Sequence, residues 1–299
     1  MPVSSRGYRH EDDFQAVMSF LRDTYSETAS LHNWLPPRFE NSGRGMESDT
    51  RIWEFCCVEP RPRILAMANP EAKFRYFIQI HPDYSFLEGE IIQWIEDHSA
   101  AQRAEPGGLR LSVVALEGNP AREEALRRHG FERGTVYGIL RLRDVDAPIP
   151  GYRVPDGFEV RSVCPEKDFE EIARGVRAVF GHGEWFTREV LEEISRLSFY
   201  HEDLDLVAVD PDGKIASFCT FRLDPPSGIA ELEPMGTLPE YRGRGLARAL
   251  LCEGFRRLER YDPALLYIGG AADNPAANRL YELTGFTERY DYIYWHKMV

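Results

Sequence analysis

The stretch that decides the fold is Glu233-Pro-Met-Gly-Thr-Leu-Pro-Glu-Tyr-Arg-Gly-Arg-Gly-Leu-Ala247, which continues directly into Arg248-Ala-Leu-Leu-Cys-Glu-Gly-Phe-Arg-Arg-Leu258. Pro239, Gly243 and Gly245 interrupt regular structure. After them, apolar residues recur at helical spacing as far as Leu258. The sequence therefore predicts a strand, then a glycine-bearing loop, then a helix.

This loop is a candidate anion site. The first N–H groups of a helix have no intrahelical acceptor and lie at the positive end of the helix dipole, an arrangement that suits phosphate. Gly243 and Gly245 let the backbone approach an anion, and Arg242 and Arg244 add positive charge. Two familiar phosphate motifs are excluded, because the stretch contains neither Gly-x-Gly-x-x-Gly nor Gly-Lys-Ser/Thr.

A second informative segment follows, Asn274-Pro-Ala-Ala277-Asn278-Arg-Leu-Tyr281-Glu-Leu-Thr-Gly285-Phe286. Asn274 suits a helix N-cap and Pro275 the first helical position. Gly285 suits the residue just after a helix, and Phe286 begins the next apolar run. A short helix followed by a strand is predicted.

The two segments together resemble the GNAT superfamily of acyl-CoA-dependent N-acyltransferases. Arg242-Gly-Arg-Gly245-Leu-Ala247 resembles that family's motif A, Gln/Arg-x-x-Gly-x-Gly/Ala, and the second segment resembles its Asn, Ala, Tyr, Gly-Phe signature. The resemblance implies an α/β (α+β) fold, with a mixed, mostly antiparallel central sheet flanked by helices. It also implies acetyl-CoA as cosubstrate, with its pyrophosphate on the loop.

The resemblance implies specific roles for these residues. The strand Pro234–Leu238 is expected to splay from its neighbour, so that its N–H groups bond the pantetheine arm and the thioester carbonyl, with Gly236 allowing close approach. Tyr281 is expected to protonate the departing CoA thiolate, the alternative being a tyrosine that fills a helix–sheet gap. The implied cofactor-binding residues are Met235, Gly236, Thr237, Arg242, Gly243, Arg244, Gly245, Leu246, Ala247, Asn274 and Asn278. For Asn274, helix capping is an equally supported role.

The general base is less determined. Glu233 lies at the end of the strand nearest the expected acceptor, and Glu231 lies on the same face two residues earlier. An equally supported alternative is that these carboxylates only lie at a solvated strand edge. A ping-pong route through Cys219 or Cys252 is set aside, because cysteine is more often a small buried residue.

The acceptor pocket, as the resemblance implies, is built by the first two helices of the domain, the loop that joins them and the last strands. Those segments supply His182, Glu184, Trp185, Phe186, Tyr290, Asp291, Tyr292 and Tyr294. Aromatic rings with carboxylates suit a cationic amine, whereas a core aromatic cluster with surface acids is the alternative. Trp34 and Arg38, in a segment 31–45 expected to be an aromatic-rich loop, are candidates to close the pocket.

The chain also contains a long internal repeat. Asn119 and Asn274 are 155 positions apart, as are Phe131 and Phe286, and Asp13-Phe14 and Asp168-Phe169. Such a period indicates a duplicated domain. The expected division is a GNAT-like domain over 1–147, a linker rich in Pro and Gly over 148–157, and a GNAT domain with the acyl-CoA site over 158–299.

The two copies differ where chemistry is expected. Ser85-Phe-Leu-Glu88 replaces Arg242-Gly-Arg-Gly245, and Leu126 replaces Tyr281. The first copy thus lacks the glycines, the positive charges and the phenol. It is expected to be a degenerate GNAT-like domain that keeps its fold.

Composition narrows the partners. The 299 residues carry a formal net charge of −13, which disfavours nucleic acid. Five cysteines without a Cys-x-x-Cys pair predict reduced thiols and no metal site. Since no signal core or run of ~18 apolar residues is present, a cytoplasmic protein without membrane contact is expected, as monomer or homodimer.

The sequence thus favours an N-acetyltransferase that moves an acetyl group from acetyl-CoA to a primary amine of a small molecule by direct attack. The alternative is a non-catalytic CoA-binding sensor or partner-binding module on a duplicated GNAT fold. Retention of Tyr281 favours the enzyme, because a binding module needs no proton donor.

Overall fold

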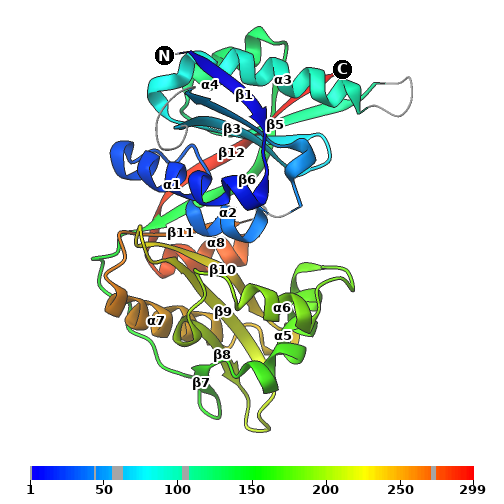
Figure 1. Cartoon of the computed structure of the whole chain (residues 1–299). Coiled ribbons are helices and arrows are strands. Elements are labelled where there is room, and N and C mark those ends of the chain that lie inside the picture. The colour runs from blue at the N-terminus through cyan, green and yellow to red at the C-terminus, as the bar shows by residue number, and fades with distance from the viewer. Residues whose placement is uncertain (1, 44, 56–62, 103–107, 271–273) are drawn as a thin grey trace. The chain divides into compact units, whose positions relative to one another are not determined.

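A computed structural model describes residues 2–43, 45–55, 63–102, 108–270 and 274–299 of the chain (Figure 1). It divides into two compact units. Unit 1 comprises Met1–Ile139 and Tyr290–Val299, and unit 2 comprises Leu140–Arg289. The division differs from the expected boundaries: residues 140–147 group with unit 2, and residues 290–299 group with unit 1.

Two long strands explain this difference. β6 (Glu132–Arg143) belongs to unit 1 as far as Ile139, and its end belongs to unit 2. β12 (Phe286–Met298) begins in unit 2, and its longer part, from Tyr290, belongs to unit 1. The sequence repeat marks where each copy starts, but it carries no information on which sheet a terminal strand joins.

Unit 1 is a mixed sheet with helices. Its strands lie in the order β1-β2-β3-β4-β5-β12, and only the β4–β5 pair is parallel among the pairings described. The elements are β1 (Val3–Gly7), α1 (His10–Thr28), α2 (Pro36–Ser42), β2 (Arg51–Phe55), β3 (Ile64–Ala72), β4 (Arg75–Ile80), α3 (Glu88–Ala101), β5 (Arg110–Leu116) and α4 (Pro120–Arg128).

One element of unit 1 corrects the sequence interpretation. The segment expected to be an aromatic-rich loop contains helix α2. Pro36 and Pro37 stand at its first positions, where a fixed φ favours helix initiation. Phe39 is fully buried, and its ring lies against those of Tyr8 and Phe14. Burial of this ring fixes a helix that local sequence alone did not indicate.

Unit 2 repeats the same plan. Its strands lie in the order β11-β10-β9-β8-β7, with the end of β6 beside β11, and its described pairings are antiparallel apart from β10–β11. The elements are β7 (Glu159–Ser162), α5 (Pro165–Phe180), α6 (Arg188–Ile194), β8 (Asp205–Val209), β9 (Ile215–Asp224), β10 (Ile229–Thr237), α7 (Leu246–Leu258), β11 (Leu265–Gly270) and α8 (Pro275–Leu283).

Alternating residues of β9 bury two separate cores in unit 2. Cys219 and Phe221 pack with α7 and α8, whereas Phe218 packs with α5 and α6, so the helix pairs cover opposite faces of the sheet (Figure 1). At Gly254 of α7, a Cβ would lie 2.0 Å from a ring carbon of Phe221. The glycine therefore lets the helix that follows the loop approach the sheet closely.

The duplication is visible in individual hydrogen bonds. In unit 1, Arg6 donates two hydrogen bonds to Asp13, at 2.7 and 2.8 Å. In unit 2, Arg161 donates two to Asp168, at 2.5 and 2.9 Å. In each unit the carboxylate also accepts the N–H of the residue four positions before it. The same contact thus joins the first strand of each unit to its first helix.

Loss of this contact in unit 2 should change the acid stability of the protein. Burial alone would raise the pKa of Asp168, but the hydrogen bonds from Arg161 and the Cys164 N–H outweigh it and hold the pKa below its ordinary value. Because the folded pKa is depressed, the carboxylate stabilises the fold at pH values above its unfolded pKa of about 4. This contribution is lost as the pH falls through the folded pKa.

We therefore expect Asp168→Asn to lower the free energy of unfolding at pH 7 by about 1–3 kcal/mol. It should also reduce the stability change between about pH 5 and pH 2. Urea unfolding at several pH values measures both quantities. The control is Asp12→Asn, which removes an exposed ion pair with Arg9 and should cost less than about 1 kcal/mol. Equal losses in the two variants would contradict the assignment.

Candidate active site

Strand β10 separates from its parallel neighbour after its first three residues. Its pairing with β11 covers Ile229–Glu231 against Leu265–Tyr267 and then ends, although β11 continues to Gly270. On the other side, the β9 pairing shifts between Leu232 and Met235 and then resumes to Thr237. The described backbone of β10 beyond this bulge therefore has no strand partner on the β11 side. We call this opening the notch of unit 2.

The backbone groups that face the notch follow from the hydrogen bonds on the β9 side. The Leu238 N–H donates to Ala216 O at 3.0 Å, and the Ser217 hydroxyl donates to Gly236 O at 2.7 Å. Because successive backbone groups of a strand point to opposite edges, those of Met235 and Thr237 face the notch. Two N–H donors are thus presented to an extended ligand that carries carbonyl groups.

The structure adds a packing reason for Gly236. A Cβ at this position would lie 2.4 Å from Cζ of Phe218, whose ring is almost fully buried between the sheet and α5. The missing side chain accommodates this ring and so keeps β10 against β9. Packing on the α5 side therefore requires a glycine here, and the expected approach of a ligand to Gly236 stays a prediction.

The loop after β10 ends at a helix N-terminus that lacks a cap. Gly243 and Gly245 have φ values of 76° and 87°, a region that disfavours other residues, and open space surrounds both Cα atoms. No side chain caps α7, and its first backbone bond runs from the Ala249 N–H to Gly245 O. Within the described ranges, the N–H groups of Leu246 and Ala247 have no acceptor.

Two arginines flank these free donors. Arg242 and Arg244 are exposed, and each is tethered by one hydrogen bond to a backbone carbonyl, Thr237 O at 3.2 Å and Glu240 O at 3.3 Å. The geometry therefore combines these N–H groups with two exposed positive charges. Such a site suits a phosphate or pyrophosphate group.

Tyr281 lies on α8 and is 9% exposed. Burial raises the pKa of its phenol, Glu233 raises this pKa further, and Arg141 lowers it. The phenol is thus protonated at neutral pH. In the part of the chain that the structure describes, its hydroxyl donates no hydrogen bond to the protein. A protonated, unbonded hydroxyl near Glu233 is available to a ligand.

The remaining residues of the second motif carry structural hydrogen bonds. The Asn274 side chain accepts the Ala277 N–H at 3.1 Å and so caps α8. The Asn278 side chain accepts a hydrogen bond from Arg141 at 3.0 Å. Their expected contacts with a ligand stay predictions beside these roles.

The two candidate bases lie in different surroundings. Glu231 is 5% exposed and lies 3.5 Å from the Arg222 guanidinium, which makes it part of a buried ion pair. Glu233 is half-buried in the bulge of β10. Neither cysteine is a candidate nucleophile, because burial raises the thiol pKa of both Cys219 and Cys252.

The expected acceptor residues fall into two groups. His182, Glu184, Trp185 and Phe186 form the loop between α5 and α6 of unit 2, and Trp185 is 63% exposed beside the His182 ring. This aromatic edge continues through Phe180 to Phe218, whose ring fills the space at Gly236. The second group, Tyr290, Asp291, Tyr292 and Tyr294, belongs to unit 1.

Trp34 and Arg38 also belong to unit 1. The Arg38 guanidinium lies 4.6 Å from the Trp34 ring and 5.9 Å from the Tyr292 ring, and it pairs with Glu71 at 2.7 Å. Trp34 itself is 2% exposed. Its ring is therefore part of the packing of unit 1 rather than a surface contact residue.

Unit 1 has the same strand separation, but its own chain fills the opening. The parallel pairing of β4 with β5 covers only Arg75 and Tyr76 against Ser112 and Val113. Beyond it, the buried Asn33 side chain donates to Ile80 O at 3.1 Å and accepts the Ile80 N–H at 2.8 Å. These Ile80 groups correspond to those of Thr237 in unit 2, because the N–H of the next residue bonds the neighbouring strand in both units.

The position of the phosphate loop is also filled in unit 1. Glu88, at the start of α3, and Arg122 of α4 are each 2% exposed and form an ion pair of 2.6 Å. Arg122 stands 155 positions before Ala277, so it takes the place of a small residue in unit 2. A carboxylate of the chain itself thus lies at the helix N-terminus where an anion would bind.

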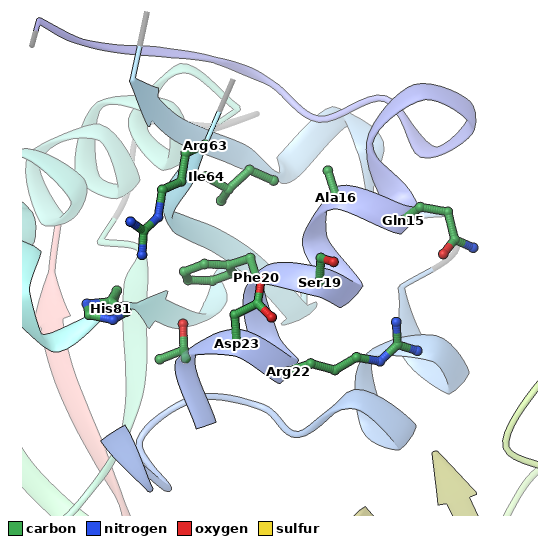
Figure 2. A pocket seen from close by; sticks show the side chains of 10 residues that line it. Gln15, Ala16, Ser19, Phe20, Arg22, Asp23, Arg63, Ile64 and His81 are labelled. Carbon is green, nitrogen blue, oxygen red and sulfur yellow. The ribbon is translucent and has the colours of Figure 1, made fainter. Parts of the chain in front are cut away.

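A pocket of about 380 Å³ lies elsewhere in unit 1 (Figure 2). One wall is formed by residues of α1, including Ser19 and Arg22, and Arg63 and His81 face it from the other side (Figure 2). Its charges are mixed, and Arg63 lies 3.6 Å from Glu27. Since none of the residues predicted for the active site lines this pocket, it does not alter the assignment to unit 2.

The described residues contain neither a candidate metal site nor a helix able to span a membrane. They include no group of three or more His, Cys, Asp or Glu side chains arranged to hold a metal ion. None of the helices described is both long and apolar enough to span a bilayer.

Comparison with known proteins gives a family match within unit 2. Residues 169–286 match the model of the acetyltransferase (GNAT) family. A mycothiol acetyltransferase of Kineococcus radiotolerans is 31% identical over 220 residues, which cover 67% of this chain and 69% of the relative. The chain belongs to the GNAT acetyltransferase family. GNAT relatives of the same name from Arthrobacter sp. and Geodermatophilus obscurus are 28% and 33% identical, and the chain spans only 66% and 65% of their lengths.

Solved structures show the same fold over the whole chain. A GCN5-related N-acetyltransferase from Sphaerobacter thermophilus has a TM-score of 0.70 at 20% identity and covers 99% of this chain and 95% of its own. A tandem GNAT protein from the clavulanic acid biosynthesis pathway has a TM-score of 0.66 at 14% identity, with 99% and 98% covered. The tandem GNAT fold expected from the sequence is therefore confirmed.

The differences between the two units predict one CoA site per chain. Gly245→Glu should abolish CoA binding, because it strains a residue with positive φ and places a carboxylate beside the free N–H groups. The matched control is Ser85→Glu, which adds an acid to the exposed counterpart loop of unit 1 and should leave binding unchanged. Isothermal titration calorimetry measures both. Two sites per chain, or loss of binding in the control, would contradict the assignment.

Proposed function

We propose that the chain is an N-acetyltransferase that moves the acetyl group of acetyl-CoA to the primary amine of a small molecule. The observation that carries this proposal is the notch of unit 2. There, within the described ranges, N–H groups of β10 without a strand partner lead to the N–H groups of α7 that have no acceptor. Glu233 lies on the same strand, and its charge acts on the Tyr281 phenol, which is protonated at neutral pH. The GNAT family supports acetyl-CoA as the donor.

Each part of the donor has a proposed place. The N–H groups of Met235 and Thr237 bind the pantetheine arm and the thioester carbonyl, where negative charge develops. The N–H groups of Leu246 and Ala247, with Arg242 and Arg244, bind the pyrophosphate. The full proposed set also includes Gly236, Gly243, Gly245, Asn274 and Asn278.

The transfer itself needs no enzyme nucleophile. The amine nitrogen attacks the thioester carbon, and Glu233 accepts the proton that the nitrogen loses, directly or through water. The C–S bond breaks, and Tyr281 donates its proton to the departing sulfur. Buried, unreactive thiols at Cys219 and Cys252 support this direct route over a route through an acyl-cysteine.

The acceptor is proposed to bind at the aromatic loop between α5 and α6. Exposed Trp185 and His182, with Glu184, offer ring faces and a carboxylate to a cationic amine. Several relatives bear the name mycothiol acetyltransferase, so the unacetylated form of mycothiol belongs in the first panel of acceptors. We further propose a cytoplasmic protein, monomeric or homodimeric, that acts without metal, nucleic acid or membrane.

A CoA-binding sensor or partner-binding module is the second candidate. It accounts for the filled notch of unit 1, which keeps the fold without the site. It does not account for a buried tyrosine whose hydroxyl makes no hydrogen bond to any described residue of unit 2. Release of free thiol from acetyl-CoA in the presence of a panel of amines distinguishes the two, because a module binds CoA without releasing it.

Tyr281→Phe tests the acid directly, because it removes only the hydroxyl. We expect kcat to fall by about 10²–10⁴-fold, while the affinity for CoA changes by less than about threefold. The matched control is Tyr261→Phe, which removes a hydroxyl bonded to Asp203 in the same unit and should leave kcat nearly unchanged. An unchanged kcat in the Tyr281 variant would show that this residue serves only in packing and is not the acid.

A further inference from the structure

Arg141 is a buried cation that the protein compensates only in part. It lies in the portion of β6 that belongs to unit 2 and is 3% exposed. Its Nη2 donates to the neutral Asn278 side chain at 3.0 Å, and its nearest carboxylate, that of Glu282, lies 3.8 Å away and is 63% exposed. Burial of a charge is costly unless a partner of opposite charge is buried with it.

The guanidinium lies against the functional face of α8. Asn278, Tyr281 and Glu282 are spaced i, i+3 and i+4, so they share one side of the helix. Arg141 contacts the first and the last of these. Among the described residues, the groups whose charges act on the Tyr281 phenol are Arg141 from β6, Glu233 from β10 and the Cys219 thiol from β9, and Arg141 is the cation among them.

We propose that Arg141 is a positioning residue whose buried charge supports Tyr281 as the acid of the transfer. This inference rests on the proposed function. When the sulfur of the departing CoA takes the phenol proton, a phenolate remains beside Arg141. Its negative charge supplies the compensation that the guanidinium otherwise lacks. The phenolate later regains a proton from water, and the proton lost by the amine stays with Glu233 until product leaves.

The need for such support follows from the surroundings of the phenol. Burial and Glu233 each make the phenolate less stable, and Arg141 alone opposes them. Without the cation, proton donation to the sulfur would leave a buried anion next to a carboxylate. The guanidinium therefore makes the phenol a stronger acid than burial would allow.

The internal repeat offers an independent comparison. In unit 1, Leu126 stands in place of Tyr281, and His296 stands 155 positions after Arg141. The His296 ring is bonded to the Ser112 hydroxyl at 3.0 Å instead of to α4. The copy that lacks the phenol thus also lacks the guanidinium, whereas the scaffold contact to Asp13 is kept. A purely structural arginine would be expected to stay with the scaffold.

The direct test measures the acidity of residue 281 in the full chain without any substrate. A fluorinated tyrosine at position 281, whose phenol is more acidic, brings its titration into a range where the protein is folded, and ¹⁹F NMR follows it. We expect Arg141→Gln to raise this pKa by about one unit or more, and Arg141→Lys to restore most of the difference. The control, Glu282→Gln, alters only an exposed carboxylate and should shift it by less than about 0.3 units.

A pKa unchanged by Arg141→Gln would overturn the inference. If that variant does not fold, Asn278→Asp tests the same point, because a carboxylate beside the guanidinium neutralises its field and should raise the pKa. If Arg141→Gln does not fold, an unchanged pKa of the residue 281 phenol in Asn278→Asp would also overturn the inference.

A kinetic cycle shows whether the effect passes through Tyr281. Arg141→Gln should lower kcat by about 10–100-fold with the KM for acetyl-CoA within about threefold. In the Tyr281→Phe background, the same change should cost less than about twofold. Additive losses would indicate a structural role and overturn the inference. A shifted pKa in a chain that transfers no acetyl group would support the electrostatic role of Arg141 and contradict the proposed function instead.

Discussion

The separation of β10 from β11 after Glu231 is the constraint on which the site depends. Parallel strands in a sheet normally satisfy each other's backbone groups, and here the pairing ends while both strands continue. The N–H groups left open need a partner from elsewhere. The bulge at Glu233 and Pro234, and the Phe218 ring that fills the space at Gly236, hold β10 on its β9 side and so keep the notch open.

The duplicated fold shows two solutions to the same constraint. In unit 1 the chain supplies the partners itself: the Asn33 side chain bonds both backbone groups of Ile80, and Glu88 with Arg122 occupies the helix N-terminus. In unit 2, among the described residues, the Thr237 carbonyl is bonded only by the exposed Arg242 side chain, and the N–H groups of Leu246 and Ala247 have no acceptor. The loop between α5 and α6 exposes Trp185. The scaffold contact between the first strand and the first helix is the same in both.

Much of this arrangement could be predicted from the sequence. Glycines at 243 and 245 and the capping asparagines at 119 and 274 act locally, over a few residues, so their patterns indicate loops and helix starts directly. Because the same local signals recur 155 positions later, they also indicate the second copy of the fold. These local signals were sufficient for the family and for the position of the loop.

What the sequence could not indicate depends on contacts between distant segments. Arg141 lies far from Tyr281 in the chain, and only the placement of the end of β6 in unit 2 brings it to α8. Glu231 and Glu233 are the same residue type two positions apart, and only the fold shows that Glu231 pairs with Arg222 on β9. Helix α2 and the division of β12 likewise follow from burial and strand pairing that no local pattern records.

The most direct test of the account is the position of the ligand in a crystal structure of the full chain grown with CoA. The account predicts one CoA molecule, with its pantetheine arm between β10 and β11 and its pyrophosphate on the N–H groups of Leu246 and Ala247. The opening between β4 and β5 should remain occupied by Asn33. Ligand density between β4 and β5, or CoA bound away from the notch of unit 2, would contradict it.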